Sequence, residues 1–68
     1  MELSWLDGFE IIVRQEKGSA VISANREGLL SLANHLKKLA EEPPGSHIHL
    51  DADNSLEEGS FELILEKK

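Results

Sequence analysis

The sequence of 68 residues contains no cysteine, and none of its hydrophobic runs approaches the roughly 18 residues that a membrane-spanning helix needs. The absence of cysteine excludes disulfide bonds and a thiol nucleophile. The first six residues carry an acid where a secretory signal peptide has basic residues. We therefore expect a soluble, cytoplasmic protein that does not bind membranes. A chain this short has apolar residues for one core only, so residues 1–68 are predicted to form a single domain.

Positive charge is also scarce in this sequence. Seven Lys and Arg residues against 13 Asp and Glu residues give a formal net charge of -6 at pH 7. Nucleic-acid-binding proteins normally present positive charge to the phosphates, so DNA and RNA are not expected as partners. An acidic surface favours basic protein partners, although acidic residues also serve simply to keep a protein in solution.

Two segments near the N-terminus predict a β-hairpin. Residues 9–15 and 20–24 are rich in β-branched and aromatic side chains, and residues 16–19 separate them. A two-residue turn at Lys17 and Gly18 would place Val13 opposite Ile22 on the core face of the hairpin. Because lysine is not favoured at the first position of such a turn, a longer loop with another register is kept as an alternative.

The next segment predicts an amphipathic helix. Asn25 is suited to an N-cap, and the prolines and glycine of residues 42–45 end the helix. His35 is placed on the polar face. Apolar residues recur at three- and four-residue steps and predict the buried face, namely Leu29, Leu32, Ala33, Leu36 and Ala40, with Leu30 and Leu39 at its margins.

Two further segments, 46–51 and 61–66, alternate polar and apolar residues and predict half-buried strands. The long acidic connection between them has Leu56 as its anchor to the body of the protein. The fold class is therefore α+β, with the order β-β-α-β-β. We expect a four-stranded, mainly antiparallel sheet with one amphipathic helix packed on one face. The strand order 2-1-3-4 keeps every neighbouring pair antiparallel.

One helix leaves the other face of such a sheet uncovered, and this open face is the predicted partner-binding surface. Exposed apolar residues surrounded by charges are typical of a protein-binding or dimer surface, although β-branched residues also suit strands wherever they point. Trp5 and Leu6 could instead fold over the face. Alternation assigns to it Glu10, Ile12, Arg14, Val21, His47, His49, Glu62, Ile64 and Glu66, and the acidic connection adds Asp51, Asp53, Glu57 and Glu58.

Two patterns are suggestive of metal sites. His47, His49 and Asp51 project from one side of a strand, as zinc ligands can, but a catalytic site would need further ligands. The acidic loop from Asp51 onward resembles a calcium loop but has Leu56 where the glycine belongs. We therefore predict no metal site, no cofactor and no enzymatic activity, and keep a small metal-binding protein as an alternative.

Three stretches together resemble a known family: residues 25–33 (NREGLLSLA), 47–51 (HIHLD) and 56–63 (LEEGSFEL). They resemble family 32 of the bacterial polymorphic-toxin immunity proteins, over roughly residues 8–66. The resemblance implies a protein that binds and neutralises a cognate toxin. An acidic immunity protein suits a basic toxin such as a nuclease. The other alternative is a homodimeric structural or regulatory protein that uses the open sheet face.

Overall fold

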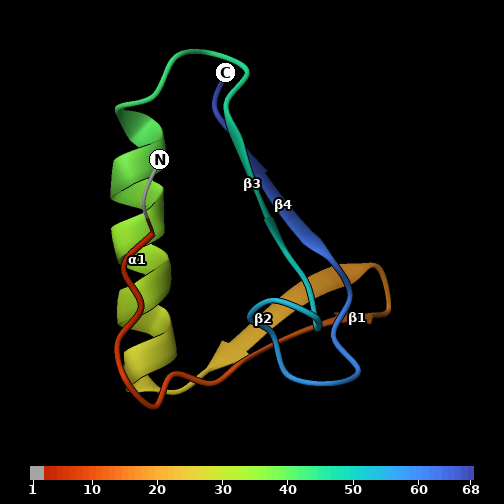
Figure 1. Ribbon diagram of the computed structural model, residues 1–68. Coiled ribbons are helices and arrows are strands. Elements are labelled where there is room, and N and C mark those ends of the chain that lie inside the picture. Colours follow the sequence, from red (N-terminus) through yellow and green to blue (C-terminus); the bar gives the residue numbers. More distant parts are fainter. Residues whose placement is uncertain (1–2) are drawn as a thin grey trace.

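The computed structural model describes residues 3–68, so Met1 and Glu2, on which part of the signal-peptide expectation rests, lie outside the described residues. The elements follow the order β1 (Ile11–Glu16), β2 (Ser19–Ala24), α1 (Arg26–Ala40), β3 (His47–Leu50) and β4 (Leu63–Glu66). Figure 1 shows α1 on one side of two strand hairpins. The predicted α+β class and the order β-β-α-β-β are confirmed. Within residues 3–68, no helix has the length and hydrophobicity needed to cross a bilayer.

The hairpin of β1 and β2 has the predicted two-residue turn. Lys17 and Gly18 both have positive φ, at 48° and 84°, the combination that matches the twist of two paired strands. The register then places Val13 opposite Ile22 and Ile11 opposite Ala24, as predicted. Lysine therefore tolerates the left-handed conformation here, and the longer-loop alternative is wrong.

The predicted four-stranded sheet and its order 2-1-3-4 are wrong. β1 pairs with β2 and β3 pairs with β4, both antiparallel, in two separate sheets. The reason is that the acidic connection occupies the edge of β1 where β3 was expected. The backbone N–H groups of Glu57 and Phe61 donate to the carbonyls of Ile11 (2.8 Å) and Val13 (2.9 Å). The Ser60 hydroxyl accepts from the N–H of Val13 at 3.1 Å.

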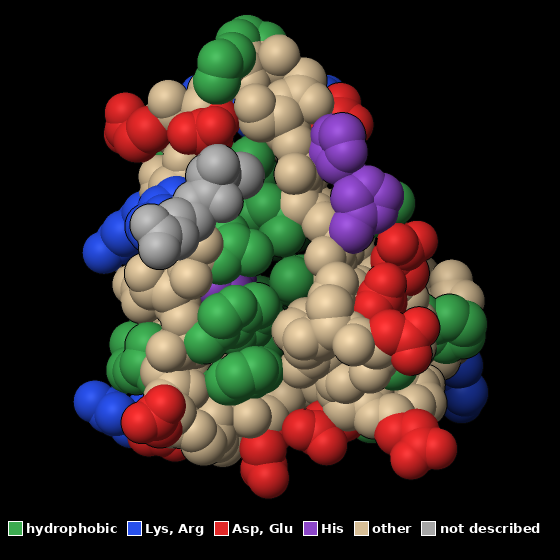
Figure 2. Space-filling view, viewed as in Figure 1, with side chains coloured by type: hydrophobic (Ala, Val, Ile, Leu, Met, Phe, Trp, Pro, Cys, Tyr) green, Lys and Arg blue, Asp and Glu red, His purple; other side chains and the backbone are tan. Residues whose placement is uncertain are grey.

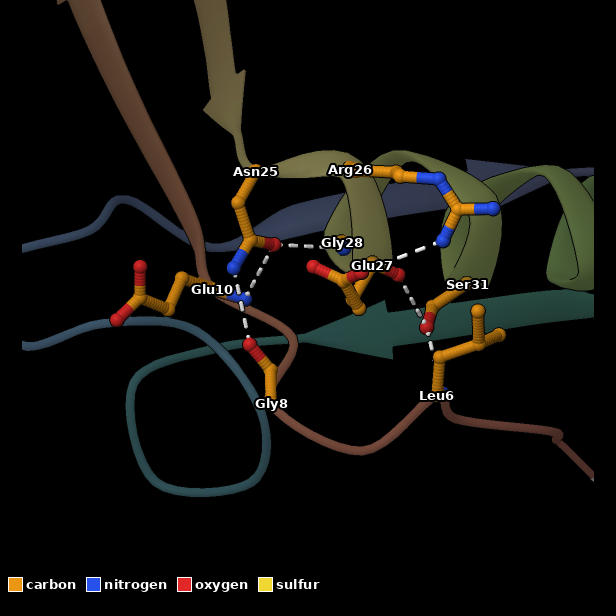
Figure 3. Close-up of polar contacts among 8 residues, drawn as sticks. All are labelled: Leu6, Gly8, Glu10, Asn25, Arg26, Glu27, Gly28 and Ser31. Atoms are coloured by element: carbon orange, nitrogen blue, oxygen red, sulfur yellow. Dashed lines mark hydrogen bonds and ion pairs between the residues drawn. The ribbon is translucent and has the colours of Figure 1, made fainter.

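Asn25 caps α1, as predicted, and also ties the helix to the chain before β1 (Figure 3). Its Oδ1 accepts from the N–H groups of Gly28 (2.8 Å) and Glu10 (3.0 Å). Its Nδ2 donates to the Gly8 carbonyl at 2.9 Å. One side chain therefore satisfies a free N–H of the first helical turn and fixes the start of the hairpin.

The predicted buried face of α1 is confirmed for Leu32 and, at its margin, Leu39, and wrong for Leu29 and Leu36. The helix buries Gly28, Ser31, Leu32, His35 and Leu39, whereas Leu29 and Leu36 are 54% and 50% exposed. The true buried face is rotated toward the N-terminal segment, residues 3–9, which lies along the helix in Figure 1. The Ser31 hydroxyl accepts from the Leu6 N–H at 2.9 Å and donates to the Glu27 carbonyl at 2.7 Å.

The N-terminal segment covers the helix and leaves the outer faces of the hairpins open. Trp5 stacks on Phe9, with ring centroids 4.5 Å apart, and meets the ring of His35 edge-on at 4.1 Å. Trp5 and Phe9 therefore pack against the core. The core also includes Leu56, which confirms the predicted anchor, and consists of Ile11, Val13, Leu32, Leu39, Ile48, Leu50 and Leu56.

Candidate partner-binding surface

The outer face of the β1–β2 hairpin carries three of the predicted binding residues. Arg14 lies opposite Val21, and Ile12 lies opposite Ser23. Arg14 is exposed and its guanidinium pairs with Glu16 two residues along the same strand. An exposed pair of this kind contributes little to stability, so the side chain of Arg14 is free to exchange partners when another surface approaches.

An open pocket of about 420 Å³ lies at the end of this face nearest to α1. Its lining comes from both strands, from the helix cap and from the acidic connection, namely Glu10, Ile11, Ile12, Ser23, Ala24, Asn25 and Glu57. The hydrogen bond from the Glu57 N–H to the Ile11 carbonyl (2.8 Å) holds Glu57 at the pocket. The pocket lining thus brings the apolar residue Ile12 together with two acidic residues, Glu10 and Glu57.

The outer face of the β3–β4 hairpin carries a second group of predicted residues. His49 lies opposite Ile64, which is 50% exposed. The Nδ1 atom of His49 lies 3.1 Å from a carboxylate oxygen of Glu62, and the rings of His47 and His49 meet edge-on with centroids 4.8 Å apart. Figure 2 shows exposed histidines over β3 with carboxylates beside them. This face therefore combines one exposed apolar side chain with two imidazole rings and a carboxylate.

Asp51 shapes the loop that follows β3. Its Oδ1 accepts from the N–H groups of Asp53 (2.9 Å) and Asn54 (3.1 Å), and the Asn54 side chain donates to the His49 carbonyl at 3.1 Å. Asp53, Glu57 and Glu58 are exposed. Within residues 3–68, no group of three or more His, Asp or Glu side chains is arranged to hold a metal ion.

The predicted residues thus fall on two hairpins and one loop. Because β1–β2 and β3–β4 are separate sheets, alternation along the strands does not place Ile12 and Ile64 on one continuous face. The acidic connection does bring Glu57 to Ile12, a proximity that sequence spacing gives no means to predict. Phe61 was predicted to begin the strand of residues 61–66, but it precedes β4 and is 58% exposed, because it belongs to the segment that runs beside β1.

Sequence reasoning missed His35, whose ring is fully buried in the core. Burial lowers the pKa of His35 below its usual value, the positive charge of Lys38 lowers it further, and the Ser4 backbone opposes the shift. Neither ring nitrogen has a hydrogen-bond partner with good geometry within residues 3–68. A helical pattern counts histidine as a polar residue, so the pattern placed His35 with the solvent-exposed residues.

A model of the family described as Immunity protein 32 matches residues 19–68, about three quarters of the chain. The match runs from the start of β2 through α1, β3 and β4, and it contains all three stretches that carry the resemblance. No curated protein and no solved structure matches the chain significantly.

Proposed function

The chain belongs to the Immunity protein 32 family, and we propose that it binds a cognate protein toxin and neutralises it by covering a surface that the toxin needs. The family match is the observation that carries this proposal. Neutralisation by binding requires a rigid, complementary surface and no catalytic group in this chain. The homodimeric structural protein and the metal-binding protein have no comparable support from a family match.

The charge of the chain favours a basic toxin. The net charge of -6 attracts a cationic partner at long range and speeds its association, an effect that salt screens. Nucleases are basic where they bind phosphates, so a nuclease toxin fits the charge. Capture of such a toxin would then place acidic groups of this chain where the nucleic acid would otherwise bind.

We propose that the pocket on the β1–β2 hairpin receives a lysine or arginine of the toxin. The side chain of Ile12 can pack against the apolar stem of such a residue, while Glu10 and Glu57 offer carboxylates to its cationic head. Val21 and Arg14 continue the contact along the hairpin. The exposed acids Asp53, Glu58 and Glu62 add to the attractive charge, with His47, His49 and Ile64 as a second contact area on the β3–β4 hairpin.

The first experiment identifies the partner. The tagged chain is expressed in its native cell, and the proteins that co-purify are identified by mass spectrometry. We expect a single toxin whose activity is blocked by a stoichiometric amount of this chain. Absence of a co-purifying toxin, or a toxin that stays active when bound, would refute the proposed function.

The second experiment tests the site with the toxin so identified. Glu10→Gln and Glu57→Gln should slow association and reduce its dependence on salt, whereas Ile12→Glu should speed dissociation, because buried contacts hold a complex that long-range charge assembles. Glu41→Gln is the matched control, since it removes the same charge from the far end of α1. Equal effects of Glu57→Gln and Glu41→Gln would leave only a general charge effect and would rule out the pocket.

A further inference from the structure

β2 has one strand edge that is not paired. The N–H of Asn25 donates to the carbonyl of Glu10 at 3.1 Å, and hydrogen-bonded pairs alternate along an antiparallel hairpin. Ser19, Val21 and Ser23 therefore direct their backbone groups toward β1, and Ala20, Ile22 and Ala24 direct theirs away from it. Within residues 3–68, no group bonds to this outward row.

Nothing in the sequence of β2 discourages another strand from pairing with this edge. Proteins usually protect free edges with charged residues, proline, a bulge or a covering segment. The strand SAVISA has no charged residue and no proline, and its pairing with β1 is regular over six residues. The opposite edge of the same sheet is covered by the acidic connection through Ile11 and Val13. The edge of β2 is thus the open side of this hairpin.

We propose that β2 pairs antiparallel with β2 of a second copy of this chain, so that two hairpins form one continuous sheet. The pairing is centred on Ile22, which lies opposite Ile22 of the second copy, and Ala20 lies opposite Ala24 on either side. In this register all three outward residues of each strand exchange backbone hydrogen bonds. Centring the pairing on Ala20 or Ala24 would leave part of each edge unpaired.

The side chains of β2 suit a copy of themselves. Ile22 is 43% exposed although it projects on the side of the sheet where the core lies, and at the centre of the pairing it meets its own counterpart. The small side chains of Ala20 and Ala24 let the two strands approach. The contact faces of the dimer are the two edges and the Ile22 side chains.

The β2 strand carries no charged residue that would oppose pairing with a copy of itself. A strand without charge gives a cationic partner no electrostatic advantage, whereas two such strands meet without any like-charge contact inside the pairing. Because each copy carries a net charge of -6, salt should strengthen the dimer by screening their repulsion, the opposite of its effect on toxin association.

Cross-linking tests the register directly, because the chain contains no native cysteine. Residues in a hydrogen-bonded antiparallel pair have Cα atoms about 5.5 Å apart, within the range that a disulfide spans. Ile22→Cys should therefore form a covalent dimer under mild oxidation. Ser23→Cys is the matched control, since its two copies would be offset by two residues along the strands and their Cα atoms would lie about 8 Å apart, too far for a disulfide. Equal cross-linking of the two variants would overturn the proposed register.

Mass measurement tests the dimer itself. Light scattering on the unmodified chain should give twice the monomer mass, with a dimer fraction that rises with concentration and with salt. Ile22→Lys should give a monomer, and Ser23→Lys, which adds the same charge on the other face of the strand, should keep the dimer. Circular dichroism checks that both variants stay folded. A monomer at every concentration and salt level, or a dimer that Ile22→Lys leaves intact, would overturn the proposal.

Discussion

Replacing Gly28 by alanine should improve helix propensity but create a steric clash. In an exposed helix this substitution stabilises by about 1 kcal/mol, because glycine loses more backbone entropy on folding. At Gly28, however, a Cβ atom would lie 2.5 Å from the carbonyl oxygen of Glu10, 2.9 Å from Cγ1 of Ile11 and 3.0 Å from Cβ of Ala24. Glycine is therefore required here because α1 and the β1–β2 hairpin approach each other too closely for any side chain.

The Glu10 carbonyl has little freedom to move away. It accepts a hydrogen bond from the Asn25 N–H at 3.1 Å, and the Glu10 N–H donates to the Asn25 side chain at 3.0 Å. Inserting a methyl group into a packed site costs about 1–3 kcal/mol, and a held backbone atom places this case at the upper end. After subtracting the propensity gain, we expect Gly28→Ala to lower the free energy of unfolding by about 2 kcal/mol, which corresponds to a decrease in Tm of about 8–16 °C.

Thermal and urea unfolding followed by far-ultraviolet circular dichroism measures this difference. Lys37→Ala serves as the control, because Lys37 is an exposed residue of the same helix and its truncation should change stability by no more than about 0.5 kcal/mol. If Gly28→Ala were as stable as the unmodified chain, or more stable, the close approach of α1 to the hairpin would be wrong.

Three further substitutions test the core, the buried histidine and the cap. Leu39→Ala should lower the free energy of unfolding by about 2–5 kcal/mol because Leu39 is 5% exposed, whereas Leu36→Ala should change it by less than about 1 kcal/mol. Equal losses in urea unfolding would mean that Leu36 is buried as the sequence predicts. The pKa of His35 is lowered in the folded state. Below the ordinary histidine pKa of about 6.5, the unfolded chain therefore binds more protons than the folded chain. The free energy of unfolding should consequently decrease as the pH falls below about 6.5. His35→Phe should flatten this part of the pH profile. An unchanged profile in this variant would show that other groups cause the pH dependence. Asn25→Ala should lower the free energy of unfolding by about 1–2 kcal/mol through loss of the cap. Asn25→Asp should recover part of that loss, because a carboxylate can still accept from Gly28 but cannot donate to Gly8. Equal stability of the two variants would mean that the acceptor atom is unimportant.

At the candidate site, alternation along a strand predicts side-chain placement correctly within each hairpin but not between the two hairpins. Alternation assigns Ile12, Arg14 and Val21 to the outer face of the first hairpin, and the observed register agrees. It also assigns His49 and Ile64 to one side of the second hairpin, where they are paired. Alternation fails between the hairpins, because it supposes a single sheet, and only the path of the acidic connection places Glu57 beside Ile12.

The sequence by itself determined the features that depend on a few neighbouring residues. The turn at Lys17 and Gly18, the cap at Asn25 and the end of α1 before Pro43 all follow from local backbone preferences, and local preferences act in any fold. The family also follows from the sequence, since a matching order of motifs needs no coordinates. The fold class and the order of the elements were also predicted from the sequence.

Only the tertiary structure decided which side of α1 is buried and how the strands group into sheets. The pair Leu29 and Leu36 and the pair Ser31 and His35 lie on different sides of the helix, about 130° apart at 3.6 residues per turn, and periodicity favours the more apolar pair. The chain buries the second pair because Leu6 bonds to Ser31 across 25 residues and Trp5 packs on His35. The strands divide into two sheets because residues 57–61 take the free edge of β1. Both outcomes depend on contacts between distant segments, whose free energies exceed the local preferences that a pattern can record.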